Sequence, residues 1–416
     1  MPEDDLLQGL IFLGLVLLVV GPIHWYLWRR LVKDTTQPGR ARRLATIGFL
    51  MLPATLLSAF ILPRVVGTKV SFALSLIGYL WLALLFYLLL TLLALEVPRQ
   101  ILLRMKAPFG GGPGGQGGGS GMVEPAQSAG TIAPVITQTE PKGVERRLVL
   151  SRGAAIFAGL TAVGLVGYGT RTALGPPVLK RVQIPLSKLP RGLDGYKIAL
   201  VSDIHLGPLT GVAHTRRIVD SINGMSADMI AVVGDLVDGS VEELRDEAAP
   251  LRDLRSRDGA FFVTGNHEYF SGAEEWLAEV GRLGLRPLRN ERLDIRGLDL
   301  AGVDDVTGGQ MAGGGPDFVK ALGDRDLSKP VILLAHQPVV AFRAAKYKVD
   351  LQLSGHTHGG QMKPFNYIAR LQQPIISGLG DVDGTKVYVT NGAGFWGPPV
   401  RVGAPPDITL VELRAA

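Results

Sequence analysis

The stretch YKIALVSDIHLG, residues 196–207, carries the pattern that decides the fold. An apolar run of the length of a buried strand ends in a polar Asp-x-His cluster, and a glycine follows. Helical patterns lie between further copies of this design, at residues 214–225, 241–257 and 273–283. Strands that alternate with helices predict an α/β fold. The further copies are DMIAVVGDLVDG (228–239), GAFFVTGNHEYF (259–270), KPVILLAHQP (329–338) and VDLQLSGHTHGG (349–360).

The polar residues that end these strands form five clusters. Ligands of α/β proteins bind beyond the carboxyl ends of the strands, where each cluster lies. One Asp-x-His at a strand end is as often a cap or a turn, but five clusters in the same register predict one shared site. The clusters also hold five of the seven histidines. They are Asp203-Ile204-His205, Gly234-Asp235-Leu236-Val237-Asp238, Gly265-Asn266-His267-Glu268, Ala335-His336 and Gly355-His356-Thr357-His358.

The donor atoms in these clusters predict a site for two metal ions. Carboxylates, imidazoles and an amide, in a chain without cysteine, suit Mn, Fe or Zn. Two dications about 3.5–4 Å apart repel by roughly 18 kcal/mol at an effective dielectric of about 20, so a bridging carboxylate and a bridging hydroxide are expected. Because residues i and i+2 of a strand point the same way, Asp203 and His205 are expected to hold one ion. The pair His356 and His358 is expected to face one cavity.

The first 106 residues predict a helical transmembrane region. Stretches at about 6–28, 44–62 and 70–97 are long and apolar enough to cross a bilayer. The chain has a net charge of +6, and much of this surplus lies in Arg/Lys clusters beside the apolar stretches. Membrane topology accounts for such clusters better than a nucleic-acid surface does.

Residues 107–143 are dominated by Gly, Pro, Ser and Gln and predict a flexible linker. Residues 144–179 predict a fourth helix and a connector, with an uncharged core at 154–169. If that core crosses the membrane, the positive-inside rule places residues 180–416 outside the cytoplasm; if it does not cross, they are cytoplasmic. We favour the crossing, and therefore a multi-pass membrane protein with an extracytoplasmic C-terminal domain.

The order D-x-H, G-D-x-x-D, G-N-H-E, a single His and G-H-T-H resembles the calcineurin-like metallophosphoesterase superfamily, over about residues 195–412. The fuller GHTHGGQ (355–361), AHQP (335–338) and the tail from GAGFWGPPV (392–400) resemble its membrane-associated bacterial phosphodiesterase branch. The resemblance implies a four-layer αββα sandwich of two mixed sheets flanked by helices, and hydrolysis by a metal-bridging hydroxide.

The resemblance also implies a role for each site residue. One of two divalent metal ions would take Asp203, His205 and His358, and Asp235 would bridge the pair. His267 would be the catalytic histidine near the leaving-group oxygen, while Asp238 and Glu268 would orient ligands or hold loops. The second ion would be held by Asn266, His336 and His356.

The substrate class is the least determined feature. A catalytic domain tethered to the bilayer suggests lipid-linked or envelope phosphodiesters. Phe395 and Trp396 could line an exposed entrance or touch lipid, although a packed loop explains them equally well. A nuclease or nucleotide phosphodiesterase is an alternative, but residues 181–416 lack a basic stripe interleaved with aromatic residues, so no nucleic acid is expected. A sensor or transporter with a regulatory domain is a further alternative. The metals, monoester or diester preference and oligomeric state stay open.

Overall fold

The computed structural model describes residues 14, 18–66, 68–104, 142–311 and 314–416. The chain divides into two compact units, residues 1–49 with 86–162, and residues 50–85 with 163–416. The second unit contains both β-sheets and every predicted site residue. The domain boundaries expected from the sequence stay a prediction.

Long helices carry the apolar N-terminal sequence. They are α2 (Arg40–Val66), α3 (Thr68–Arg104) and α4 (Lys142–Leu174), and residues 18–28 are also helical and continue into the π-helical turn η1 (Arg29–Lys33). Among the described residues, two helical segments are long and apolar enough to cross a bilayer, Val70–Ile101 and Arg147–Leu174.

These two segments contain the predicted spans 70–97 and 154–169, and the predicted span 44–62 lies within α2. Of the first predicted span, 6–28, residues 14 and 18–28 are described and helical, and the rest lies outside the described residues, as does nearly all of the predicted linker at 107–143.

The first sheet is built from the strands that precede the first three clusters. Strands β2 to β5 run parallel, β12 is antiparallel to β2, and β1 is parallel to β12. Because Val201 pairs with Val232, the polar residues that follow β2 and β3 emerge at the same edge. The strand order is β1 (Val178–Leu186), β12 (Asp407–Ala415), β2 (Lys197–Val201), β3 (Met229–Val233), β4 (Ala260–Val263) and β5 (Leu285–Pro287).

The second sheet supplies the two remaining clusters. Its four central strands are parallel, and its two outer strands, β10 and β6, are antiparallel to their neighbours. Both sheets are therefore mixed, as predicted. The strand order is β10 (Gly378–Val382), β11 (Thr385–Val389), β9 (Leu351–Ser354), β8 (Val331–Leu334), β7 (Leu298–Gly302) and β6 (Glu291–Ile295).

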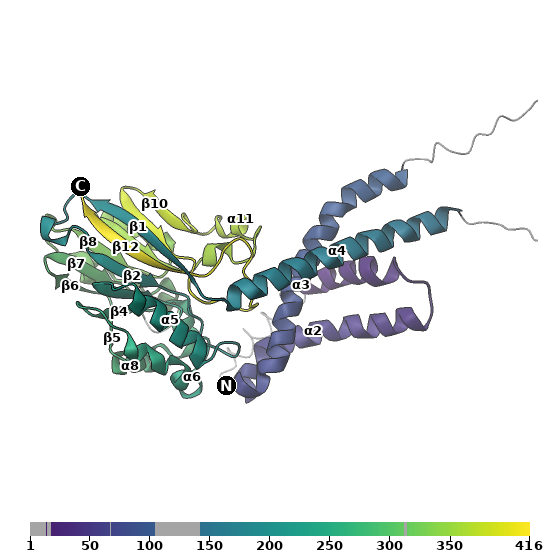
Figure 1. Cartoon of the computed structure of the whole chain (residues 1–416), viewed down its shortest axis with the longest axis horizontal. Helices are drawn as coiled ribbons and strands as arrows, with labels where there is room; N and C mark the ends of the chain where they lie inside the picture. Colours follow the sequence, from purple (N-terminus) through teal and green to yellow (C-terminus); the bar gives the residue numbers. More distant parts are fainter. Residues whose placement is uncertain (1–13, 15–17, 67, 105–141, 312–313) are drawn as a thin grey trace, which may run out of the picture. The chain divides into compact units, whose positions relative to one another are not determined.

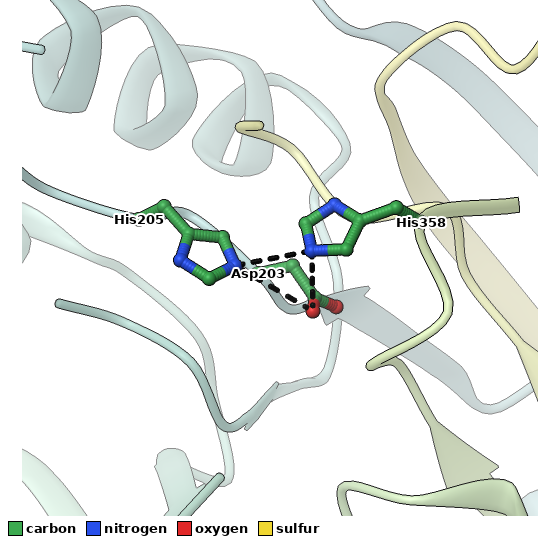
Figure 2. Close-up of side chains that lie close together, drawn as sticks. All are labelled: Asp203, His205 and His358. Carbon is green, nitrogen blue, oxygen red and sulfur yellow. Dashed lines mark hydrogen bonds and ion pairs between the residues drawn. The ribbon is translucent and has the colours of Figure 1, made fainter. Parts of the chain in front are cut away.

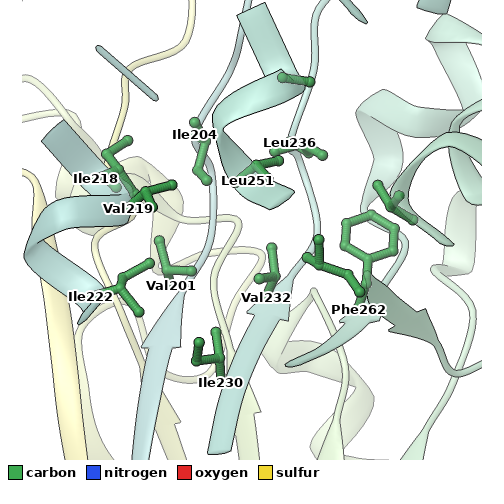
Figure 3. Packing of buried hydrophobic residues seen from close by; sticks show 14 of the residues in the cluster. Val201, Ile204, Ile218, Val219, Ile222, Ile230, Val232, Leu236, Leu251 and Phe262 are labelled. Atoms are coloured by element: carbon green, nitrogen blue, oxygen red, sulfur yellow. The ribbon is translucent and has the colours of Figure 1, made fainter. Parts of the chain in front are cut away.

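Alternation along the strands divides the core into layers. In β2, Ile198 and Leu200 face the core between the two sheets, whereas Ala199 and Val201 face helices on the other side. Figure 3 shows this outer core, where Ile218 and Ile222 of α5 pack over the strands. The predicted four-layer αββα sandwich is confirmed.

Helices cover the outer face of each sheet. The first sheet is covered by α5 (Val212–Gly224), α6 (Val241–Ala248) and α8 (Ala273–Arg282), which lie together on one side of the sandwich in Figure 1. The second sheet is covered by α9 (Phe318–Leu322) and α10 (Ala341–Lys346). The remaining short helices are η2 (Arg191–Leu193), η3 (Ala249–Asp253), α7 (Asn266–Ser271), η4 (Val306–Gly309), η5 (Pro338–Val340), η6 (His358–Gly360) and α11 (Asn366–Ala369).

Candidate metal centre

Three predicted ligands meet where the loops after β2 and β9 come together. The Nε2 atoms of His205 and His358 are 3.1 Å apart, and Oδ1 of Asp203 lies 3.3 Å from Nε2 of His358 and 3.9 Å from Nε2 of His205. Figure 2 shows the two rings turned toward the Asp203 carboxylate from opposite sides. All three residues are buried. This group, cluster 1, brings three electron-pair donors to one point.

The backbone in these loops differs from the expected strand geometry. Strand β2 ends at Val201 and β9 at Ser354, so neither the Asp203–His205 pair nor the His356–His358 pair lies in a strand. The expectation that strand alternation aligns each pair is therefore wrong. Instead, all four residues and Asp235 adopt left-handed backbone conformations, with φ between 49° and 71°. Such conformations are costly for residues other than glycine and are concentrated at functional sites.

A second group, cluster 2, consists of Asp235, His336 and His356. Nε2 of His336 lies 3.1 Å from Oδ2 of Asp235, and Nδ1 of His356 lies 3.0 Å from Oδ1 of Asn266. The other ring nitrogen of His336, Nδ1, is 2.8 Å from the carbonyl oxygen of Val233. This contact turns Nε2 of His336 into the cluster, toward the carboxylate of Asp235.

Asp235 faces both clusters. Its Oδ2 atom lies 3.8 Å from Nε2 of His205 in cluster 1 and 3.1 Å from Nε2 of His336 in cluster 2. Gly265 allows this approach, because a Cβ atom there would lie 2.2 Å from Oδ1 of Asp235. The Asp235 loop is held by Glu268, whose carboxylate accepts hydrogen bonds from the backbone N–H groups of Asp235, Leu236 and Gly265. The buried Glu268 therefore shapes the loop.

His267 lies beside cluster 1 and shares a carboxylate with it. One oxygen of Asp238, Oδ1, is 2.7 Å from Nδ1 of His267 and 2.8 Å from Nδ1 of His205. Burial lowers the pKa of His267, but the charge of Asp235 and the hydrogen bond and charge of Asp238 outweigh it and raise that pKa to about 9. Without bound metal, the His267 ring is therefore cationic at neutral pH.

Two exposed aromatic rings flank His267. The ring of Phe270 lies 5.7 Å and that of Trp396 6.2 Å from the His267 ring, centroid to centroid, both edge-on. Trp396 is 54% exposed, as the sequence suggested, whereas Phe395 is buried at 4% exposure. Of the two readings that the sequence left open, exposure holds for Trp396, whereas Phe395 is packed into the domain.

Arg401 is a site residue that the sequence reasoning missed. It is fully buried, its Nη2 atom lies 2.9 Å from Nδ1 of His358, and its Nη1 atom donates to the His358 carbonyl oxygen at 2.7 Å. Further bonds reach the carbonyl oxygens of Asn391 and Gly394. Arg401 thus fixes both the ring and the backbone of a predicted ligand. An arginine in a segment rich in Gly and Pro gives no signal of such a contact.

The donor set of the two clusters fits divalent cations. Burial, aided by the nearby charge of His336, lowers the pKa of His356 to about 4, and burial also lowers the pKa of His358. Both rings are therefore neutral at physiological pH, which is the state that binds a metal. Neutral imidazoles with carboxylates and an amide oxygen suit Mn, Fe or Zn. Burial lowers the pKa of His336, but the charge and hydrogen bond of Asp235 outweigh it and raise that pKa, so a cation held at Nε2 of His336 would displace a proton there.

Comparisons with known proteins agree with this geometry. A model of the calcineurin-like phosphoesterase family matches residues 196–360. A Danio rerio protein named "Transmembrane protein with metallophosphoesterase domain" is 40% identical over 270 residues, which are 62% of this chain and 62% of that protein. The alignment with this vertebrate relative thus spans less than two thirds of its length.

Two bacterial relatives are covered more fully. An uncharacterized metallophosphoesterase of Helicobacter pylori is 40% identical over 257 residues, 60% of this chain and 68% of that protein. Another, from Aquifex aeolicus, is 36% identical over 240 residues, 57% of this chain and 91% of that protein. At this identity and coverage, with the family's motif residues brought to one edge of both sheets, the chain belongs to the calcineurin-like phosphoesterase family.

Proposed function

We propose that this chain is a membrane-anchored phosphodiesterase with a two-metal centre. The family implies a metal-dependent phosphoester hydrolase, and the diester preference is our proposal. The observation that supports the two-metal centre is the position of Asp235, whose single carboxylate faces two separate groups of buried donor atoms. The proposed ligands are Asp203, His205 and His358 for one ion, Asn266, His336 and His356 for the other, and Asp235 for both.

Two divalent cations held by these residues would supply positive charge that polarises the phosphoryl group and lowers the pKa of water at the site. The chain's own residues do the rest. Asp238 holds Nδ1 of His267, which leaves Nε2 to meet the leaving oxygen and give it a proton. The His267 side chain is 16% exposed, so it can reach a substrate while its ring stays fixed by Asp238.

The membrane location and substrate complete the proposal. We place the chain in the cell membrane as a multi-pass protein, with residues 180–416 outside the cytoplasm, on the basis of the two apolar helices and the distribution of basic residues. Membrane anchoring favours lipid or envelope phosphodiesters as substrates. Because the chain has no cysteine, a Leu327→Cys variant offers one exposed thiol in the catalytic domain. Labelling by an impermeant maleimide in intact cells supports this topology, and labelling only after lysis contradicts it.

Activity is tested with the full-length protein in detergent, loaded with Mn²⁺, on a soluble bis-aryl phosphodiester and the matching monoester. His267→Ala is expected to lower kcat by about 10²–10⁴-fold, because the leaving oxygen loses its proton donor. Metal content, measured by mass spectrometry, and the unfolding temperature serve as controls and should be unchanged. A metal-loaded His267→Ala protein with the wild-type rate would remove this role, and preference for the monoester would refute the diester assignment.

A further inference from the structure

A short segment beside the metal centre exposes large apolar side chains. Residues 365–371 follow cluster 1 in the chain and include helix α11. Phe365 is 46% exposed, Tyr367 67%, Ile368 55% and Leu371 84%. Single exposed apolar residues are common, but four within seven residues indicate a surface that binds something. We call residues 365–371 the apolar segment.

The backbone of the apolar segment lines up three of these side chains. The N–H of Ile368 donates to the carbonyl oxygen of Phe365, and the N–H of Leu371 donates to that of Ile368, so both are i to i+3 turns. Side chains three residues apart in such turns lie one above the other, which places Phe365, Ile368 and Leu371 in a row. The sequence has no Asp or Glu between residues 361 and 380, and Arg370 is exposed. An apolar row with a basic neighbour matches an anionic lipid surface.

Backbone hydrogen bonds connect this region to a candidate membrane helix. The N–H of Lys363 donates to the carbonyl oxygen of Val402, and the N–H of Arg401 donates to that of Gly169. Gly169 lies in the membrane-spanning candidate Arg147–Leu174, which is part of helix α4. The packing at Gly169 is close, because a Cβ atom there would lie 2.5 Å from Cγ1 of Val400. Hydrogen bonds through Arg401 and Val402 therefore connect Lys363, just before the apolar segment, to the C-terminal part of a helix of membrane-spanning length.

A series of contacts continues from this region to the metal centre. Gln361 donates through Nε2 to the carbonyl oxygens of Trp396 and Pro398, and its Oε1 accepts from the N–H of Trp396. Trp396 in turn lies edge-on to His267 and is half exposed. A bilayer surface that covers the apolar segment would thus lie beside the mouth of the site.

We propose that the apolar segment inserts into the headgroup layer of the bilayer, and that the site takes a lipid phosphodiester directly from that layer. The substrate part rests on the function proposed above, whereas the membrane contact does not. The acyl-bearing part of the substrate would stay in the lipid while its phosphodiester group reaches His267 past Trp396. This arrangement explains why apolar side chains stay exposed at the entrance of a site that acts on a charged group.

The membrane contact is tested with a single thiol in the full-length protein reconstituted in anionic vesicles. Leu371→Cys carries a fluorophore that lipids with brominated acyl chains quench on contact, and Val319→Cys on α9, 69% exposed, is the matched control. We expect quenching at residue 371 to exceed that at residue 319 by at least about threefold, because bromine quenches only at close range. Equal quenching overturns the proposal. Shielding of residue 371 without quenching, as a second copy or a protein partner would cause, also overturns it.

The substrate route is tested with Ile368→Ser and Leu371→Ser combined. Hydrolysis of a fluorogenic lipid phosphodiester in vesicles should fall roughly tenfold, because two apolar side chains no longer hold the mouth against the lipid. Hydrolysis of the soluble bis-aryl diester should stay within about twofold, as it should for both substrates in Val319→Ser. Equal loss on both substrates means a disturbed fold or metal centre and overturns the route. A wild-type protein inactive on every diester refutes the proposed function, and the quenching result then still decides the membrane contact.

Discussion

Replacing Asp238 by asparagine tests how far the chemistry depends on one carboxylate oxygen. Oδ1 of Asp238 accepts from Nδ1 of His205 at 2.8 Å and from Nδ1 of His267 at 2.7 Å. Asparagine keeps the shape and an acceptor oxygen but removes the charge. A hydrogen bond to a charged group is worth about 1 kcal/mol more than a neutral one, so two bonds lose about 2 kcal/mol. If the whole loss falls on the transition state, it corresponds to a roughly 30-fold decrease in kcat/KM.

A second effect of Asp238→Asn concerns pH. The charge and hydrogen bond of Asp238 help to raise the pKa of His267 to about 9, so their weakening lowers that pKa. A proton donor loses activity as the pH rises through its pKa, and this loss should therefore begin at lower pH in the variant. Divalent cations bound nearby lower the pKa in both proteins, so the informative quantity is the difference between the two pH profiles.

The assay is the pH dependence of kcat/KM on a soluble phosphodiester, with metal content measured in parallel. Asp253→Asn is the matched control, because Asp253 pairs with Arg216 at the surface and both side chains are more than 40% exposed. Such a pair contributes little, and the control should behave as the wild type. An Asp238→Asn enzyme with a wild-type kcat/KM and an unshifted alkaline limb would refute the view that this oxygen positions and charges His267.

Three further outcomes are expected. Asp235→Ala should lose both metals, as read by mass spectrometry, because its carboxylate faces both clusters; retention of two ions per chain would contradict the bridging role. Gly169→Val should destabilise the protein by about 1–3 kcal/mol through overpacking, whereas Gly164→Val, which meets nothing within 4 Å, should not; equal unfolding temperatures would count against the close packing. Burial lowers the pKa of His214 to about 4, so the unfolded chain binds more protons between pH 4 and 6.5, and stability is lost as the pH falls through that window. In His214→Asn, the free energy of unfolding, measured by urea titration, should fall less between pH 6.5 and pH 4, by up to about 3 kcal/mol. An unchanged dependence of this free energy on pH would assign the acid sensitivity to other groups.

The amino-acid sequence determined the α/β alternation and the strands that carry the site. Strands β2, β3 and β4 are short apolar runs that end in polar residues, and such runs are buried from both sides in any packed arrangement. Strand β1 was not predicted, because its residues are mostly exposed or half-buried, and what holds it is its long pairing with β12. Edge strands of this kind depend on a neighbour that the local pattern does not reveal.

In the metal centre, too, the sequence predicted some features and only the folded structure decided the others. Motif spacing pointed to Asp203, Asp235 and the paired histidines, since their residue types are donors and each follows a strand. The local sequence could not supply the left-handed backbone that aims these side chains, the sharing of Asp238 between two rings, or the contact of Arg401 with His358. Each of these arises from loops that are distant in the chain and are brought within hydrogen-bond range by the packing of two sheets. Residue types are local properties, whereas direction and distance exist only once the sandwich has formed.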